Sequence, residues 1–529
     1  MQAAHRVAKN TGILYARMAI TVFISLYATR LVLAALGVAD FGLFNVVGGV
    51  IAMLGFLNSS MAAATQRFMS FAQGEGDLEK VKRIFNMSTL LHAGIAVLMV
   101  LVLEIAGYFF FNGILNIAPE RVEVAKIIYH FMVVSTFFTV LSVPYEAVIT
   151  SHENMLFYAI LGIIESVLKL VIALYLAYSA FDHLVAYGFL MAALSIFLLI
   201  LRRIYCHRNY VECVFDFRKY YEKDLMKEIT SFAGWSLLGS ASSMIAAYGQ
   251  GIVINVFFGT VINAAQGIAN QVSGQLGVFA GTMQKALNPM IDKSEGAGNR
   301  QLLLKASMLG SKLSFFLLML TFIPFLIEMP FIFGIWLKNV PEYAILFCRL
   351  LLIRNLIEQT YTTLTATIAA VGNIRSFQIT TSIFNILPLI ISYLLFENGF
   401  PAYYLYVSFI IYSILQSIIV MYFAKKKCGM SISQYLGEVV FRCVFSFIIV
   451  IALSIIPLYL LDESYTRLLF VLAIAFISSL IVIWFIGFSS EEKIKINNIG
   501  QGFVKKIGFK KYSYLKYICI SINTKITLQ

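Results

Sequence analysis

The stretch NMSTLLHAGIAVLMVLVLEIAGYFF (86–110) contains one carboxylate, Glu104, in an otherwise uncharged run. About 20 apolar residues in an α-helix cross the ~30 Å of hydrocarbon in a bilayer, because each residue adds about 1.5 Å. The run is too long for a strand of a transmembrane barrel, and it lacks the strict alternation of such a strand. It therefore predicts a membrane-spanning helix.

Similar apolar runs repeat along the whole chain. The sequence is 60% apolar and 13% charged, with a mean hydropathy of +0.84, whereas soluble domains carry about 25% charged residues. We therefore expect an all-α polytopic membrane protein with about fourteen transmembrane helices. The expected spans are 11–36, 41–66, 86–110, 127–149, 156–178, 183–201, 230–257, 263–290, 304–327, 342–371, 377–396, 402–424, 438–461 and 466–488.

Lysine and arginine gather in one set of loops. The longest of these loops, 202–229, is basic, whereas the opposite set holds only Arg121, Lys126, Lys338 and Arg467. The positive-inside rule therefore predicts a multi-pass membrane protein with both termini in the cytoplasm. The same asymmetry accounts for the net charge of +13. No basic arm with interleaved aromatic residues indicates a nucleic-acid partner.

The cysteines and the loops argue against several classes of protein. The six cysteines form no CxxC pair, so we expect neither a metal site nor a cofactor. A membrane glycosyltransferase, ligase or polymerase needs acid–base or metal-binding residues near one membrane face. The external loops are short, and their acidic clusters are Glu120 with Glu123 and, in the last hairpin, Asp462 with Glu463. We therefore expect a protein that is not an enzyme.

The chain matches itself at an offset of 222 residues. Each half contributes about six spans, an even number, so both halves enter the membrane in the same direction. Transporters use such a parallel repeat to rock two halves around a central cavity. Chance matching of glycines in an apolar background is the alternative. The matched glycines are Gly12 with Gly234, Gly37 with Gly259, Gly55 with Gly277, Gly74 with Gly296, and Gly76 with Gly298.

Two motifs connect the sequence to a known family. LGVADFGLFNVVGGV (36–50) follows the first span, and ATQRFMSFAQGEGD (64–77) closes the second. With these motifs and two six-span halves, the chain resembles the polysaccharide-unit flippases (Wzx-type O-antigen translocases) of the multidrug/oligosaccharidyl-lipid/polysaccharide exporter superfamily. The resemblance covers the first twelve spans, and the last two match the extra pair of the flippase branches. The motifs identify the superfamily better than the substrate.

The resemblance implies an architecture and partners. It implies two helix bundles around a V-shaped cavity, and alternating access for an undecaprenyl-diphosphate-linked oligosaccharide used in O-antigen or capsule assembly. Membrane lipid and the polysaccharide polymerase machinery are the further partners expected. We expect five parts, which are an N-lobe (1–201), a basic cytoplasmic loop (202–229), a C-lobe (230–424), spans 13 and 14 (425–488) and a basic cytoplasmic tail (489–529).

Arginines within the first span are candidates for a substrate site, because a charge in hydrocarbon is costly unless it faces water or a partner. Guanidinium groups bind phosphate oxygens in pairs, which suits Arg17 and Arg30 to a diphosphate. The two residues are 13 positions apart, which is about 220° around an ideal helix, so both cannot point into one cavity. Snorkelling to the lipid headgroups is the alternative for each.

Two other spans carry opposite charges four residues apart, Glu165 with Lys169 and Arg354 with Glu358. Either each pair neutralises itself on its helix, or the cations bind substrate while the carboxylates tune them or carry a coupling ion. Glu146 in the fourth span is a third candidate for ion or proton coupling.

Amides mark the eighth span. Asn263, Gln266 and Asn270 share one helix face, and amides both bind sugar hydroxyls and join helices to one another. We predict substrate contact for these three residues, with helix packing as the alternative. The leading hypothesis is a flippase, and the runner-up is a cation-coupled multidrug exporter of the same superfamily. Such an exporter is expected to place a carboxylate in the cavity of the first half, where this chain has arginines.

Overall fold

The helical fold expected from the apolar runs is confirmed. The computed structural model describes residues 2–53, 55–114, 119–176, 178–337, 339–494 and 496–497, and these ranges contain helices and no strand. Eleven of the described helices are long and apolar enough to cross a membrane. One of them, α9, has 74 residues, and at about 1.5 Å per residue it is far too long for one crossing. The count of fourteen spans stays a prediction.

The first seven helices form one bundle, which we call the N-bundle. In it α1 packs on α6, α4 packs on α7, and α3 packs on α4 and α2. Short η1 (Phe110–Ile114) and η2 (Pro119–Arg121) flank the connection between α3 and α4. The N-bundle consists of α1 (Gln2–Met53), α2 (Gly55–Glu75), α3 (Leu78–Phe109), α4 (Val122–Leu141), α5 (Val143–Ser151), α6 (Met155–Leu176) and α7 (His183–Asn209).

The next long helices form a second bundle, which we call the C-bundle. α9 packs on α10, α11 and α12, and α11 packs on α13. The largest apolar core of the described chain lies here, with Met319, Phe322 and Phe347 wholly buried. The C-bundle consists of α9 (Lys223–Gly296), α10 (Arg300–Trp336), α11 (Ala344–Val371), α12 (Arg375–Glu397) and α13 (Tyr404–Cys428), and short α8 (Phe217–Tyr220) lies between the bundles in sequence.

Two ion pairs connect the last helices to α10, one at the start of α17 and one beyond its other end. Arg467 at the start of α17 makes two 2.8 Å contacts with the carboxylate of Glu328, which is wholly buried. Beyond the other end of α17, Glu492 lies 2.5 Å from the buried ammonium of Lys312. We therefore expect this segment to move as one body with the C-bundle. It consists of α14 (Ile432–Tyr435), η3 (Leu436–Val440), α15 (Phe441–Ser454), α16 (Ile456–Leu460), α17 (Tyr465–Val482) and η4 (Ile483–Gly487).

Helix ends differ in places from the expected spans. α7 continues to Asn209 and α9 begins at Lys223, so much of the expected loop 202–229 is helical. The polar stretch there was interpreted as a loop because its charges end the apolar run. Of the expected tail 489–529, the structure describes 489–494 and 496–497, and the rest lies outside the described residues.

The 222-residue repeat reappears in the backbone. Gly37 in α1 and Gly259 in α9 both have φ of 75° and interrupt their helices. Gly76 and Gly298 both have positive φ, at 77° and 69°. Glycine reaches such backbone angles without the steric cost that a Cβ atom brings. The two halves therefore bend and turn at corresponding positions.

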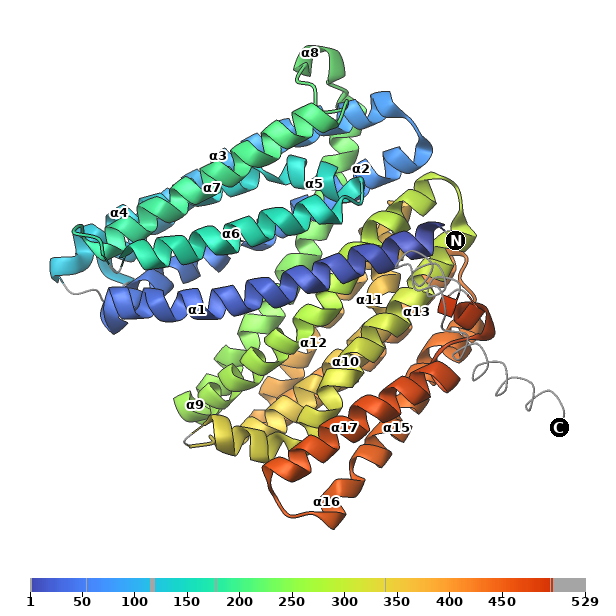
Figure 1. Cartoon of the computed structure of the whole chain (residues 1–529). Helices are drawn as coiled ribbons and strands as arrows, with labels where there is room; N and C mark the ends of the chain where they lie inside the picture. The colour runs from blue at the N-terminus through green and yellow to red at the C-terminus, as the bar shows by residue number, and fades with distance from the viewer. Residues whose placement is uncertain are drawn as a thin grey trace, which may run out of the picture.

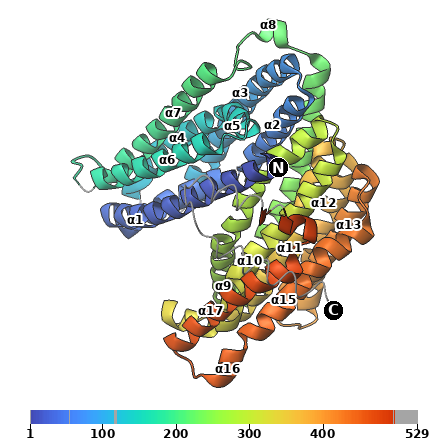
Figure 2. The ribbon, with the colours of Figure 1, turned by 45° about the vertical axis from the view of Figure 1, so that its right-hand side comes forward.

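The two bundles meet at one end and diverge from it (Figures 1 and 2). The start of α1 lies at the closed end, and α2 packs along α9. A Cβ atom at Gly74 would overlap the carbonyl group of Lys293, and one at Gly296 would overlap that of Phe71. Residues 71 and 293, like 74 and 296, are related by the repeat offset. The closed end is therefore a reciprocal contact between the two repeats.

We expect Gly74→Ala to destabilise the closed end, because a backbone carbonyl cannot turn aside as a flexible side chain can. The apparent Tm of purified protein in detergent, followed by tryptophan fluorescence, should fall. Gly94→Ala in α3 is the matched control, since a Cβ atom there meets nothing within 4 Å. The control should be neutral or more stable by up to ~1 kcal/mol, because alanine favours helices. Equal Tm values for the two variants would contradict the reciprocal contact.

Candidate functional site

A cavity of about 630 Å³ lies between the N-bundle and the second half of α9. We call it the central cavity. Each helix contributes residues from a single face, as the 3.6-residue period requires. On α7, for example, the lining residues are Met191, Leu194, Ser195, Leu198 and Arg202. The other lining helices are α2, α4, α5 and α6.

Two carboxylates line the central cavity, and each is paired with a lysine. Glu165 and Lys169 lie 2.7 Å apart on α6. Glu146 of α5 lies 2.9 Å from Lys285 of α9. The first pair is contained within one helix, whereas the second joins the two bundles.

Two arginines supply further positive charge at the cavity. Arg202 lines the central cavity and donates to the Ser142 hydroxyl at 3.4 Å. Arg17 lies 4.4 Å from the centroid of the Tyr158 ring, and its buried Nε has no hydrogen-bond partner. Within the described ranges, neither guanidinium has a carboxylate within ion-pair distance. Both interact electrostatically with Glu146.

The Tyr158 side chain contacts both Arg17 and Lys285, and Lys285 in turn pairs with Glu146. The Tyr158 hydroxyl oxygen accepts a hydrogen bond from Lys285, and Lys285 Nζ lies 4.0 Å from the ring centroid. A Cβ atom at Gly162, one turn along α6, would overlap the Arg17 guanidinium. The cluster of Arg17, Lys285, Arg202 and Glu146 is therefore held by α1, α5, α6, α7 and α9 together.

Amide side chains complete the lining of the cavity. Asn58, Gln66, Gln284 and Asn288 all contribute to it. The Oδ1 atoms of Asn58 and Asn288 are buried and accept no hydrogen bond from any described residue. Buried polar atoms are usually satisfied, so an orphaned acceptor indicates a site for a ligand or water. The cavity therefore offers cations together with free amide oxygens.

Several residues predicted from the sequence lie elsewhere. Arg30 is exposed and outside the cavity lining. Asn263 and Gln266 lie against Gly251 in the first half of the same helix, and Asn270 is exposed. Of the predicted site residues, the structure places Lys169, Glu165 and Glu146 in the central cavity and Arg17 beside it.

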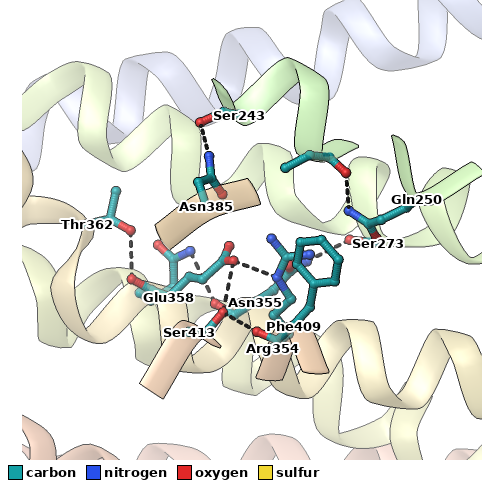
Figure 3. A network of polar contacts seen from close by, with 12 residues as sticks. Ser243, Gln250, Ser273, Arg354, Asn355, Glu358, Thr362, Asn385, Phe409 and Ser413 are labelled. Atoms are coloured by element: carbon teal, nitrogen blue, oxygen red, sulfur yellow. Dashed lines mark hydrogen bonds and ion pairs between the residues drawn. The ribbon is translucent and has the colours of Figure 1, made fainter. Parts of the chain in front are cut away.

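Arg354 and Glu358 belong to a second polar cluster, inside the C-bundle (Figure 3). Arg354 Nε lies 2.8 Å from Glu358, and the guanidinium lies 4.7 Å from the centroid of Phe409. Ser413 donates to the same carboxylate at 3.4 Å. None of these four side chains lines the central cavity. The i,i+4 pair is therefore neutralised within its own bundle.

The sequence interpretation missed Lys285 and Arg202 as site residues. Lys285 lies in the amide-rich eighth span, between Gln284 and Asn288, and this polar face was the signal for it. Arg202 was assigned to a cytoplasmic loop because the apolar run ends at 201. Its spacing from Leu198, at i,i+4, is the signal that the helix continues. In the part of the chain that the structure describes, no three His, Cys, Asp or Glu residues gather as a metal site would require.

Comparison with solved structures shows the fold. The chain matches a mutant MATE transporter with a TM-score of 0.71 and 14% identity, over 80% of this chain and 96% of that one. It matches the outward-facing conformation of a multidrug resistance MATE family transporter of the MOP superfamily with a TM-score of 0.69 and 14% identity, over 80% and 95%. This chain has the MATE transporter fold.

A third match bears on the pocket. A MOP superfamily transporter from Pyrococcus furiosus, whose reversed binding-pocket polarity suggests a different function, matches with a TM-score of 0.67 and 14% identity, over 80% of this chain and 95% of that one. No family model and no curated protein matches the sequence. The expected all-α, multi-pass fold is thus shown.

Proposed function

We propose that the chain is a flippase that moves a polyprenyl-diphosphate-linked oligosaccharide between the two leaflets of the bacterial inner membrane. The observation that carries the proposal is the charge of the central cavity. Both of its carboxylates are paired with lysines. Arg202 in the lining and Arg17 beside it form no ion pair with a carboxylate in the part of the chain that the structure describes. A diphosphate is a fitting ligand, because guanidinium groups bind phosphate oxygens through paired, charge-assisted hydrogen bonds.

The amides support the sugar part of the substrate. Sugar hydroxyls both donate and accept hydrogen bonds, and the amide side chains in the cavity lining can do both in return. A cavity of about 630 Å³ is within the usual range for a small-molecule site. The polyprenyl chain remains in the lipid, so only the polar headgroup has to be enclosed.

In this proposal the headgroup moves from the cytoplasmic to the periplasmic leaflet. The positive-inside rule places the closed end of the bundles at the cytoplasm, so the state described here opens toward the periplasm. One structural neighbour is outward-facing. Rocking the bundles about their contact between α2 and α9 would then expose the headgroup to each side in turn. The polysaccharide polymerase machinery would take the product.

A multidrug exporter is the competing function within the same fold. An organic cation needs a free carboxylate, and Glu146 and Glu165 are both neutralised by a lysine in this state. For the P. furiosus transporter of the same fold, the reversed polarity of the binding pocket suggests a different function. The polarity of the central cavity therefore favours an anionic substrate.

Genetic rescue tests the proposal. We expect expression in a flippase-null strain to restore surface polysaccharide and to lower the lipid-linked intermediate, and Arg17→Gln to abolish the rescue. Arg30→Gln is the matched control, because Arg30 lies on the same helix but is exposed, whereas Arg17 contacts Tyr158 beside the cavity. Each variant must reach the membrane at wild-type level. Lower accumulation of a cationic dye without any rescue would favour the multidrug exporter instead.

A further inference from the structure

The ion pair between Glu146 and Lys285 both joins the two bundles and lines the central cavity. Glu146 comes from the N-bundle and Lys285 from the C-bundle, with 2.9 Å between their charged atoms. Both residues also line the central cavity, with side chains that are 32% and 35% exposed. A ligand in the cavity can therefore reach the same contact that joins the bundles.

Lys285 is the one charged residue that the C-bundle contributes to the described lining of the central cavity. The other lining cations, Lys169 and Arg202, belong to the N-bundle. An anion held by the N-bundle can therefore recruit only Lys285 from the opposite side. In the state described here Lys285 is already bound to Glu146 and to the Tyr158 hydroxyl.

We infer that Lys285 is a shared residue, which binds Glu146 when the bundles are closed at this end and binds the diphosphate of the substrate when they are apart. The inference rests on the proposed function and adds the coupling between substrate and bundle movement. Glu146 and the diphosphate compete for one ammonium group. A ligand shifts a two-state equilibrium by its difference in affinity for the two states, so closure of this end weakens diphosphate binding.

Weaker diphosphate binding on closure of this end favours movement of the headgroup toward the periplasm. With the closed end at the cytoplasm, the headgroup is held tightly in the state open to the cytoplasm. It is released as Glu146 takes Lys285 back in the state open to the periplasm. Coupling between sites is typically about 5- to 150-fold in affinity.

Binding of farnesyl diphosphate to the purified full-length protein tests the inference. Glu146→Gln frees Lys285, so we expect its affinity to be at least about fivefold higher than that of wild type. Lys285→Gln should bind more weakly, and Lys285→Arg should retain binding. If Glu146 competes with the diphosphate, Glu146→Gln raises the affinity and Lys285→Gln lowers it. If the ion pair is purely structural, its loss lowers the affinity in both variants.

Distance measurements test the movement. Spin labels at Asn209→Cys on α7 and Gln301→Cys on α10, in a Cys519→Ser background, report separation of the bundles, since both positions are exposed and the other cysteines are buried. We expect farnesyl diphosphate to increase the long-distance population in wild type, and Glu146→Gln to do so without ligand. Glu123→Gln is the matched control, because it frees Lys126 within one helix, outside the lining of the central cavity, and should leave the distance unchanged.

The outcomes separate the inference from the proposed function. Weaker binding in both Glu146→Gln and Lys285→Gln, or distances that do not respond to Glu146→Gln, would overturn the coupling and leave the flippase proposal in place. No binding of farnesyl diphosphate to the wild type would overturn both.

Discussion

Arg202→Gln should weaken binding of farnesyl diphosphate about 10- to 100-fold. The loss of one hydrogen bond to a charged group costs about 1.5–3 kcal/mol, and each 1.4 kcal/mol is about tenfold in affinity. The residue lines the central cavity and has no carboxylate partner among the described residues, so its charge is available to a ligand. Titration calorimetry of the purified protein would measure the change.

The control for this prediction lies on the first helix. Arg17→Gln should weaken binding by a similar factor, because its guanidinium joins the same cluster through Tyr158. Arg30→Gln should bind as wild type does, since Arg30 is exposed outside the cavity lining. Equal losses for Arg17→Gln and Arg30→Gln would mean that the arginines act through general surface charge, and the assigned cavity would then be wrong.

Glu328→Gln should produce the largest loss of stability. Glu328 is wholly buried and holds Arg467 through two 2.8 Å contacts. Removal of one partner from a buried pair costs about 3–5 kcal/mol. The second carboxylate near Arg467, that of Glu463 at 3.5 Å, is exposed and compensates only part of the remaining charge. The apparent Tm of the purified protein should fall clearly, and the double variant Glu328→Leu with Arg467→Met should recover much of the loss.

An exposed ion pair provides the comparison. Lys126 and Glu123 are three residues apart on the surface, with a 2.7 Å contact, and exposed pairs contribute about 0–1 kcal/mol. Lys126→Met should therefore leave the Tm nearly unchanged. A Tm for Glu328→Gln as high as that of Lys126→Met would show that the ion pair between Glu328 and Arg467 does not stabilise the packing of α17 on α10.

The fold was predictable because hydropathy and helix length are local properties. Runs such as 86–110 indicate helices without any knowledge of neighbours, and the glycines at positions 37 and 259 already match at the repeat offset. The structure adds that both glycines bend their helices at the same φ. The ends of α7 and α9 were misjudged because polar residues at a membrane surface end an apolar run without ending the helix.

The site was predictable only in part, because it depends on contacts between distant segments. Lys169 and Glu165 are neighbours on one helix, so their pairing follows from spacing alone. Glu146 and Lys285 are 139 residues apart in the sequence, as are Glu328 and Arg467. The sequence around each of these residues does not predict which residue it pairs with. Arg354 is a candidate by charge, and the structure places it beside Glu358 and Phe409 inside the C-bundle, a position that its own helix does not predict.

The most direct test of the central claim is transbilayer movement in proteoliposomes. A fluorescent polyprenyl-diphosphate-linked N-acetylglucosamine, quenched from outside by a membrane-impermeant reductant, reports movement between leaflets. We predict that the wild type speeds this movement, that Arg17→Gln and Arg202→Gln do not, and that Arg30→Gln does. Movement of tetraphenylphosphonium by the wild type, with none of the diphosphate lipid, would contradict the account.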